Sequence, residues 1–169
     1  MITDLVQIKR LGEKKREENG RFRVHLKTHD YNERRFRRIG EEIEEQIDCT
    51  VCANCCRVAT VEVSGRDIDR LAKALQIKRQ KFIDEYTVLN EKEGTTDLLR
   101  TAAGCVFLSG NDCTVYEDRP DICRHFPHVV RGEGRITTRM WQFIDRACYC
   151  PIVYNALEAF KKEVDFPSK

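Results

Sequence analysis

Nine cysteines are the residues of this chain best suited to chemistry, and they fall into two groups. An odd number of cysteines with two adjacent members fits poorly with a fully paired disulfide framework. In a reducing compartment, thiols serve metal or redox chemistry more often than disulfides. The cysteine content therefore predicts metal binding. The first group is Cys49, Cys52, Cys55 and Cys56, and the second is Cys105, Cys113, Cys123, Cys148 and Cys150.

The spacing Cys49-x2-Cys52-x2-Cys55 places three thiolates within seven residues, where a tight loop can present them to one centre. The same spacing opens the bacterial ferredoxin pattern, whose fourth ligand is a cysteine followed by proline. Cys150-Pro151 has that local form. A zinc ion held by four cysteines is equally compatible with this spacing. Zinc and an iron–sulfur cluster therefore both remain open.

The adjacent pair Cys55 and Cys56 predicts two centres, because neighbouring side chains of an extended segment point to opposite faces. The first predicted centre contains Cys49, Cys52, Cys55 and, as its fourth ligand, Cys150. The second contains Cys56, Cys105, Cys113 and Cys123. Cys148 is left over, and it lies close enough to Cys150 to replace it. A single buried cysteine often merely packs, but five in one group favour ligation.

Other metal-binding folds and a cysteine–histidine catalytic pair are disfavoured. The second group runs Cys105-x7-Cys113-x9-Cys123, which lacks the second close pair of a zinc ribbon or RING domain. His125 and His128 follow Cys123, and we expect them to donate hydrogen bonds near the metal loop or to be exposed. No catalytic residue is assigned.

The first 48 residues are expected to be helical and well solvated, since they carry 12 basic and 11 acidic residues. One helix is predicted over residues 3–18, with Asn19-Gly20 as its stop. A second is predicted over 31–47. Its basic cluster at 34–38 is followed by the acidic block 41–45, which indicates a solvated amphipathic helix and not a nucleic-acid patch.

The later elements are expected to surround the cysteines. Ser64 and Asp67 predict a capped helix, Pro151 predicts the start of a final helix, and the turn 109–112 predicts a hairpin that brings Cys105 near Cys113. No internal repeat is evident. The other predicted elements are a strand over 59–63, a helix carrying Phe82, Ile83 and Tyr86, strands over 98–102, 105–108 and 113–116, and a hairpin joining 129–130 to 135–138.

These elements predict an α+β fold, with a mainly helical frame around a small cysteine-rich loop and hairpin that forms the metal-binding centre. At 169 residues, one domain is expected overall. Its predicted parts are a charged helical N-terminal extension (1–48), a cysteine-cluster metal-binding core (49–151) and a C-terminal helix packed on that core (152–169).

The charge balance also limits the partners. Thirty basic and 28 acidic residues leave a formal charge of +2, whereas a nucleic-acid-binding domain normally carries an uncompensated basic excess. The sequence shows neither a signal peptide nor an apolar run long enough for a membrane span. We expect a cytoplasmic protein without nucleic-acid or membrane partners; an unknown protein partner stays open.

Two blocks of this sequence resemble a known family. They are Cys49-x2-Cys52-x2-Cys55-Cys56 and the stretch from Gly104 to Pro127, which includes Arg119-Pro120 and Cys123-Arg124, and Cys150-Pro151 follows them. Together they resemble the CxxCxxCC family of zinc- or iron-chelating proteins, the YkgJ-like cysteine-cluster proteins. The resemblance implies a cytoplasmic prokaryotic protein that chelates metal through its cysteines. His128, where an aromatic residue often stands, and the additional Cys148 depart from the pattern.

The expected function is that of a metal-binding protein with zinc or iron, including an iron–sulfur cluster, in two centres. The alternatives are an iron–sulfur oxidoreductase component, or an accessory or modifying enzyme related to protein lysine N-methylation, because flagellin lysine N-methylases contain a similar cysteine domain. No Gly-rich loop for S-adenosylmethionine follows a strand here. Arg119 and Arg124 are interpreted either as charge compensation for thiolates or as ion-pair partners of Asp118 or Asp121.

Overall fold

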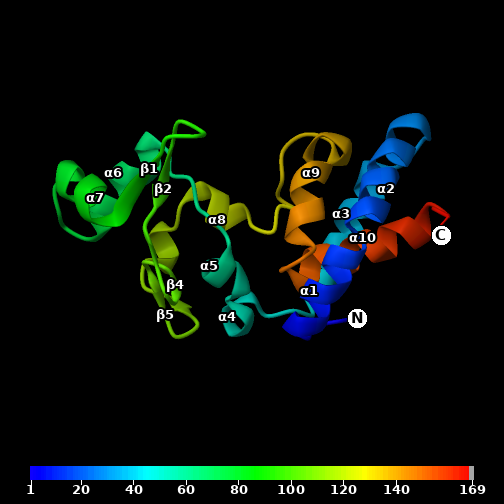
Figure 1. Cartoon of the computed structure of the whole chain (residues 1–169), viewed down its shortest axis with the longest axis horizontal. Coiled ribbons are helices and arrows are strands. Elements are labelled where there is room, and N and C mark those ends of the chain that lie inside the picture. Colours follow the sequence, from blue (N-terminus) through cyan, green and yellow to red (C-terminus); the bar gives the residue numbers. More distant parts are fainter. Residues whose placement is uncertain (168–169) are drawn as a thin grey trace. The chain divides into compact units, whose positions relative to one another are not determined.

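The computed structural model of the chain describes residues 1–167. More than half of the residues are helical, and the strands form small antiparallel sheets, so the predicted α+β fold with a mainly helical frame is confirmed (Figure 1). Across these residues, no helix combines the length and apolar character needed to cross a membrane.

Two compact units make up the chain. Unit 1 combines residues 1–48 with the chain from Pro127 onward, and unit 2 is the continuous segment Cys49–Phe126. The first boundary coincides with the predicted start of the cysteine core. The second lies between Phe126 and Pro127, so the stretch 127–151, which was expected in the metal-binding core, belongs to unit 1.

Unit 1 is helical because its sequence supplies both caps and apolar stripes. The Asp4 side chain accepts a hydrogen bond from the Gln7 N–H group (2.8 Å), and Asn32 caps the third helix in the same way. Pro151 is the first residue of the last helix, as predicted. The helices of unit 1 in the described chain are α1 (Leu5–Lys14), α2 (Arg16–Thr28), α3 (Glu33–Glu44), α9 (Ile136–Arg146) and α10 (Pro151–Glu163).

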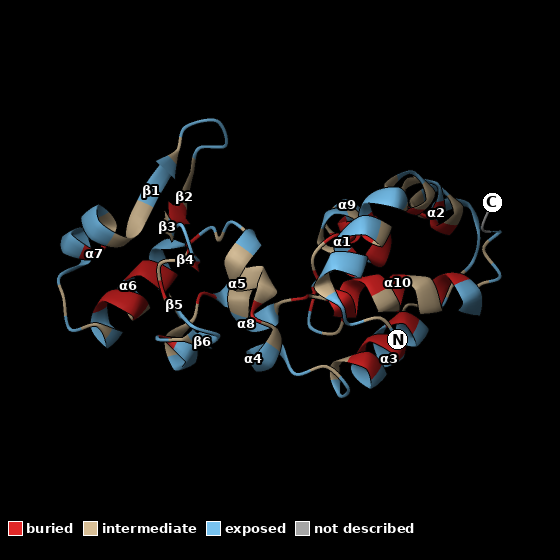
Figure 2. Ribbon diagram, turned by 60° about the horizontal axis from the view of Figure 1, so that its bottom comes forward, coloured by how far each residue is buried: buried red, intermediate tan, exposed pale blue. Residues whose placement is uncertain are grey.

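Aromatic side chains form the centre of unit 1. The Phe36 ring lies 5.1 Å from Phe160 and 5.7 Å from Phe143, measured between ring centroids, which joins α3 to α10 and α9. Gly40 allows a close approach, since a Cβ atom there would lie 2.4 Å from Val129 Cγ1. Buried residues accordingly run along α10 (Figure 2).

Two predictions for unit 1 are wrong. The stop at Asn19-Gly20 is overridden, because Asn19 and Phe22 are buried and α2 continues through Gly20. The hairpin around residues 132–134 is replaced by α9, in which Ile136, Met140 and others recur at helical spacing and are fully buried. In both places, tertiary burial of an apolar face outweighs local turn residues.

Unit 2 contains short elements only. Its three antiparallel sheets have two strands each and pair β1 with β2, β3 with β4, and β5 with β6. Its helices are α4 (Cys49–Cys52), α5 (Asn54–Val58), α6 (Gly65–Ala74), α7 (Arg79–Tyr86), the 3-10 turn η1 (Tyr116–Asp118) and α8 (Asp121–His125). Its strands are β1 (Thr87–Asn90), β2 (Thr95–Leu98), β3 (Arg100–Thr101), β4 (Gly104–Cys105), β5 (Leu108–Ser109) and β6 (Asp112–Cys113).

The hydrophobic core of unit 2 lies beside the cysteine segment and not within it. The predicted capping box of α6 is present, and Phe82, Tyr86 and Phe107 stack with centroid distances of 5.3 to 6.3 Å. In residues 49–58, Ala53 alone is buried. The core consists of Val63, Ile68, Leu71, Ala72, Phe82, Leu98, Phe107 and Val115.

The predicted strand over residues 59–63 is shorter than expected. One isolated antiparallel bridge joins Glu62 to Asp97, and the N–H group of Val63 donates to the Thr96 carbonyl (2.8 Å). This segment therefore lies beside β2 and connects the cysteine helices to the α6 cap.

Candidate metal centre

The first cysteine group occupies two short helices joined at Ala53. Cys49 and Cys52 begin and end α4, and Cys55 and Cys56 lie in α5. Ala53 adopts a left-handed conformation with φ of 44°, and its N–H group donates to the Cys49 carbonyl (2.9 Å). The left-handed residue Ala53 ends α4 and precedes α5. The four thiols therefore lie in two consecutive helical turns.

The adjacent pair does not lie in an extended segment. In a helix, neighbouring side chains are separated by roughly 100° around the axis, and the sulfurs of Cys55 and Cys56 are 4.0 Å apart. The premise that these two side chains point to opposite faces is therefore wrong. The helix α5 instead holds the two sulfurs close together.

Two consecutive hairpins present the next two cysteines in the same way. In the first, Cys105 pairs with Arg100 across β3 and β4; in the second, Cys113 pairs with Leu108 across β5 and β6. In each hairpin, the strand partner of the cysteine lies five residues before it in the sequence. Equivalent positions of the two hairpins are eight residues apart. The predicted turn is present at residues 110–111, but the predicted hairpin of strands 105–108 and 113–116 is wrong, because Cys105 and Cys113 lie in different hairpins.

The hydrogen bonds of the two hairpins repeat with the same offset. The N–H group of Val106 donates to the Leu99 carbonyl (3.0 Å), and that of Thr114 donates to the Phe107 carbonyl (2.9 Å). The structure thus contains an eight-residue backbone repeat, although the sequence alone indicated no internal repeat.

Each hairpin also directs a backbone amide at its cysteine sulfur. The Phe107 N–H group donates to the sulfur of Cys105, and the Val115 N–H group donates to that of Cys113. In both cases the donor lies two residues after the cysteine. Such bonds stabilise a thiolate, which is the form that binds metal.

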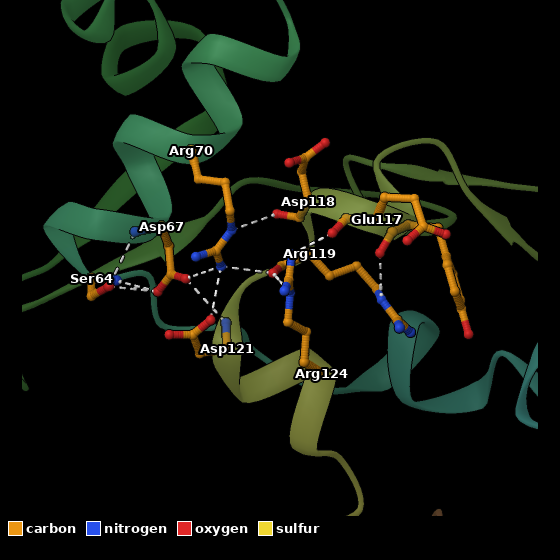
Figure 3. A network of polar contacts seen from close by, with 9 residues as sticks. Ser64, Asp67, Arg70, Glu117, Asp118, Arg119, Asp121 and Arg124 are labelled. Atoms are coloured by element: carbon orange, nitrogen blue, oxygen red, sulfur yellow. Dashed lines mark hydrogen bonds and ion pairs between the residues drawn. The ribbon is translucent and has the colours of Figure 1, made fainter.

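Cys123 is carried by α8, and a buried acidic residue fixes the start of that helix. The Asp67 carboxylate accepts hydrogen bonds from Ser64 Oγ (2.6 Å) and from the N–H group of Asp121 (3.0 Å). Arg70 donates to Asp67 (2.5 Å) and to Asp121 (3.0 Å) (Figure 3). The network joins the cap of α6 to the first residue of α8, two positions before Cys123.

Four thiols, from α5, the two hairpins and α8, interact electrostatically. Burial and the charges of the three other thiols raise the pKa of Cys123 to about 12. Burial also raises the pKa of Cys105 and of Cys113, and the charge of Cys56 adds to the effect in both. These four thiols, Cys56, Cys105, Cys113 and Cys123, are the predicted members of the second centre.

Cys56 differs from the other three thiols. The hydrogen bond from Cys55, followed by the nearby Arg119 and Arg57 guanidinium groups, lowers the pKa of Cys56 to about 6 against the opposing effect of burial. A thiolate at this position is therefore favoured near neutral pH.

Arg57 and Asn111 clamp the first cysteine group to the second hairpin. Arg57 donates to the carbonyl groups of Cys52 and Gly110 (3.0 Å each) and to the Asn111 side chain. Asn111 in turn donates to the Val51 carbonyl (2.8 Å). Sequence reasoning missed this clamp, because three of its four hydrogen bonds span more than 50 residues of chain and have no local signature.

A second arginine joins the first cysteine group to the first hairpin. Arg100, the strand partner of Cys105, donates to the carbonyl groups of Arg57 and Ala59 at the end of α5. The Arg100 charge also lowers the pKa of Cys105, against the larger effect of burial. The bond to α5 therefore places a positive charge next to the thiols.

The structure separates the roles of Arg119 and Arg124. The Arg119 guanidinium lies 3.5 Å from the centroid of the Tyr116 ring, and its charge lowers the pKa of three of the four thiols. Arg124 instead donates to two backbone carbonyl groups. Among residues 1–167, neither forms an ion pair with Asp118 or Asp121. Charge compensation thus describes Arg119 and not Arg124.

The last two cysteines belong to unit 1. Cys148 is buried and donates to the Ile144 carbonyl (3.5 Å), and burial raises its pKa to about 11. Cys150 is buried directly before α10. The assignment of Cys150 to the first centre stays a prediction, as do the roles of His125 and His128.

The thiols are suitable ligands for a soft metal, although their sulfurs do not yet converge on one point. Nowhere in the described chain do three Cys, His, Asp or Glu side chains converge closely enough to hold an ion. Thiolate sulfur is the preferred ligand of zinc and of iron–sulfur clusters. The side chains present therefore fit zinc or iron, and binding would draw neighbouring thiols together.

The chain was compared with models of known protein families. A family model described as "CxxCxxCC: Putative zinc- or iron-chelating domain" matches residues 48–151. This range covers more than half of the chain and contains all nine cysteines. No curated protein and no solved structure matches the chain.

Proposed function

Because the chain belongs to the CxxCxxCC family of zinc- or iron-chelating domains, we propose that it binds zinc or iron through the thiolates of unit 2. The carrying observation is the electrostatic interaction of Cys56, Cys105, Cys113 and Cys123, which come from α5, two hairpins and α8. Four thiolates satisfy a tetrahedral ion without any other donor.

The surroundings of these thiols support the proposal. Four thiolates around one divalent ion leave a net charge of about −2. The guanidinium groups of Arg57, Arg100 and Arg119 lie within electrostatic range of one or more of the thiols. Two amide N–H groups also donate to the sulfurs. Positive charge and hydrogen bonds of this kind stabilise an anionic metal–thiolate centre.

The first predicted centre, at Cys49, Cys52 and Cys55, is proposed as an additional metal site. Three thiolates leave one position of a tetrahedral ion for a fourth ligand, for which Cys150 is the donor expected from the sequence. Because these three cysteines have the spacing of a ferredoxin, an iron–sulfur cluster is the alternative to zinc at this centre. An electron-transfer function would follow from that cluster, and a role in protein lysine N-methylation would require a partner.

Metal content tests the proposal directly. The full chain should be purified anaerobically with reductant and analysed for zinc, iron and acid-labile sulfide, together with its visible spectrum. Bound zinc without colour would select the zinc protein, and brown protein with iron and sulfide would select the iron–sulfur candidate. A folded chain that holds neither metal, and takes up neither on reconstitution, would refute the proposal.

Single substitutions test the site itself. Cys105→Ser should lower the bound metal per chain, because it removes a thiol of the proposed centre. Cys148→Ser is the matched control, since Cys148 is a buried cysteine of unit 1 that donates to a backbone carbonyl. Equal metal content in both variants, with both folded, would contradict the proposed ligands.

A further inference from the structure

The number of thiols in unit 2 bears on the fourth ligand of the first centre. Unit 2 contains seven of the nine cysteines. Two tetrahedral ions need eight metal–sulfur bonds, and seven sulfurs supply eight bonds if one sulfur bonds to both ions. Thiolate sulfur has the lone pairs for such a bridge. One of the seven would then lie between the two groups.

The geometry of Cys56 fits the first group. Its sulfur lies 4.0 Å from that of Cys55. Two sulfurs bound to the same tetrahedral ion at about 2.3 Å are separated by about 3.8 Å. The helical turn α5 thus already holds this pair close to the spacing that a shared ion requires.

Cys56 also fits the second group. Gly104 packs against its backbone so closely that a Cβ atom there would lie 2.6 Å from the Cys56 carbonyl oxygen, which puts the next residue, Cys105, beside Cys56. The charge of Cys56 acts on Cys105, Cys113 and Cys123 alike. Cys56 thus has neighbours in both groups.

We infer that the sulfur of Cys56 bridges two metal ions, one held with Cys49, Cys52 and Cys55, and the other with Cys105, Cys113 and Cys123. This inference rests on the proposed function and replaces Cys150 as the fourth ligand of the first ion. Both ions bind to a single continuous unit of the chain.

The charge balance agrees with this arrangement. Seven thiolates and two divalent ions carry a net charge of about −3. Arg57, Arg100 and Arg119 supply three positive charges that act on thiols of the centre. The bridged centre is thus neutral as a whole, which lowers the cost of holding it in a partly buried place.

Cadmium NMR tests the bridge. The full chain is stripped of metal under reductant and loaded with ¹¹³Cd²⁺, a thiolate-seeking probe with a nuclear spin. We expect two ions per chain and two resonances, each split by coupling to the other ion through the shared sulfur. Two unsplit resonances, or a single bound ion, would overturn the inference while leaving metal binding intact. No bound cadmium would instead contradict the proposed function.

Two variants identify the bridging residue. Cys150→Ser should keep both ions and the splitting, whereas Cys56→Ser should lose either one ion or the splitting. Loss of one ion from Cys150→Ser, or retained splitting in Cys56→Ser, would overturn the assignment. The wild-type splitting needs no substitution, so a Cys56→Ser chain that does not fold leaves the first measurement decisive.

Discussion

Replacing Asp67 by alanine should weaken the part of unit 2 that positions Cys123. The carboxylate is only 5% exposed and accepts hydrogen bonds from Ser64 and Asp121 while pairing with Arg70. A hydrogen bond to a charged group contributes about 1.5–3 kcal/mol, and water replaces part of this at Ser64. We therefore expect a loss of about 2–4 kcal/mol in the free energy of opening.

Native-state hydrogen exchange measures this loss directly. The amides of α6 should be followed in the metal-free chain under reductant, because their exchange reports the free energy of local opening. Asp69→Ala is the matched control on the same helix: its carboxylate also pairs with an arginine, Arg79 (2.8 Å), but is 64% exposed. The control should cost about 0–1 kcal/mol.

The effect should also depend on pH. Although burial opposes it, the hydrogen bonds from Ser64 and Asp121 and the charge of Arg70 hold the pKa of Asp67 below its ordinary value of 3.8. A carboxyl group with a lowered pKa stabilises the fold above its unfolded pKa, and this stabilisation is lost as the pH falls through the folded value. The difference between wild type and Asp67→Ala should be constant near neutral pH and should shrink below about pH 4. Equal losses for Asp67→Ala and Asp69→Ala would refute the reasoning.

Three further perturbations address the cysteine segment. Gly104→Ala should destabilise unit 2 by about 1–3 kcal/mol, because φ is +130° and the new Cβ atom would meet Cys56. It should also weaken cadmium binding in a competition titration. In the control Gly94→Ala the new Cβ atom meets open space, so the variant should cost about 1 kcal/mol and leave cadmium binding unchanged. Metal removal should speed hydrogen exchange in residues 49–58 far more than in α7, since Ala53 is the one buried residue of that segment; uniform changes would contradict this. Arg119→Gln should raise the pKa of Cys56 and slow its alkylation in the metal-free chain near neutral pH. Arg124→Gln, the control, should leave the alkylation rate unchanged. Equal alkylation rates in the two variants would count against charge compensation by Arg119.

Local signals in the sequence predicted the elements that depend on local chemistry. Ser64 and Asp67 predicted the capping box of α6 because both partners lie within one helical turn. Pro151 predicted the start of α10 because its fixed φ suits the first helical position. The family resemblance is confirmed by the match over residues 48–151.

Features that depend on distant packing were not predictable in this way. The helical conformation at Cys55 follows a left-handed Ala53, and alanine has no local preference for that conformation. The eight-residue hairpin repeat is carried by backbone hydrogen bonds, and Cys105 and Cys113 are the one identical pair of residues between the segments 99–106 and 107–114. The Arg57 clamp needs both the turn at 110–111 and the last residues of α4, 51–52.

The discontinuous composition of unit 1 has a consequence for the order of events on the ribosome. Unit 2 is complete once Phe126 has been added, but unit 1 still lacks α9 and α10, whose side chains make much of its interior. At about 5–20 residues per second, the roughly 37 residues from there to Glu163 take about 2–7 s to synthesise. All seven thiols of unit 2 are therefore synthesised before the two helices that complete unit 1.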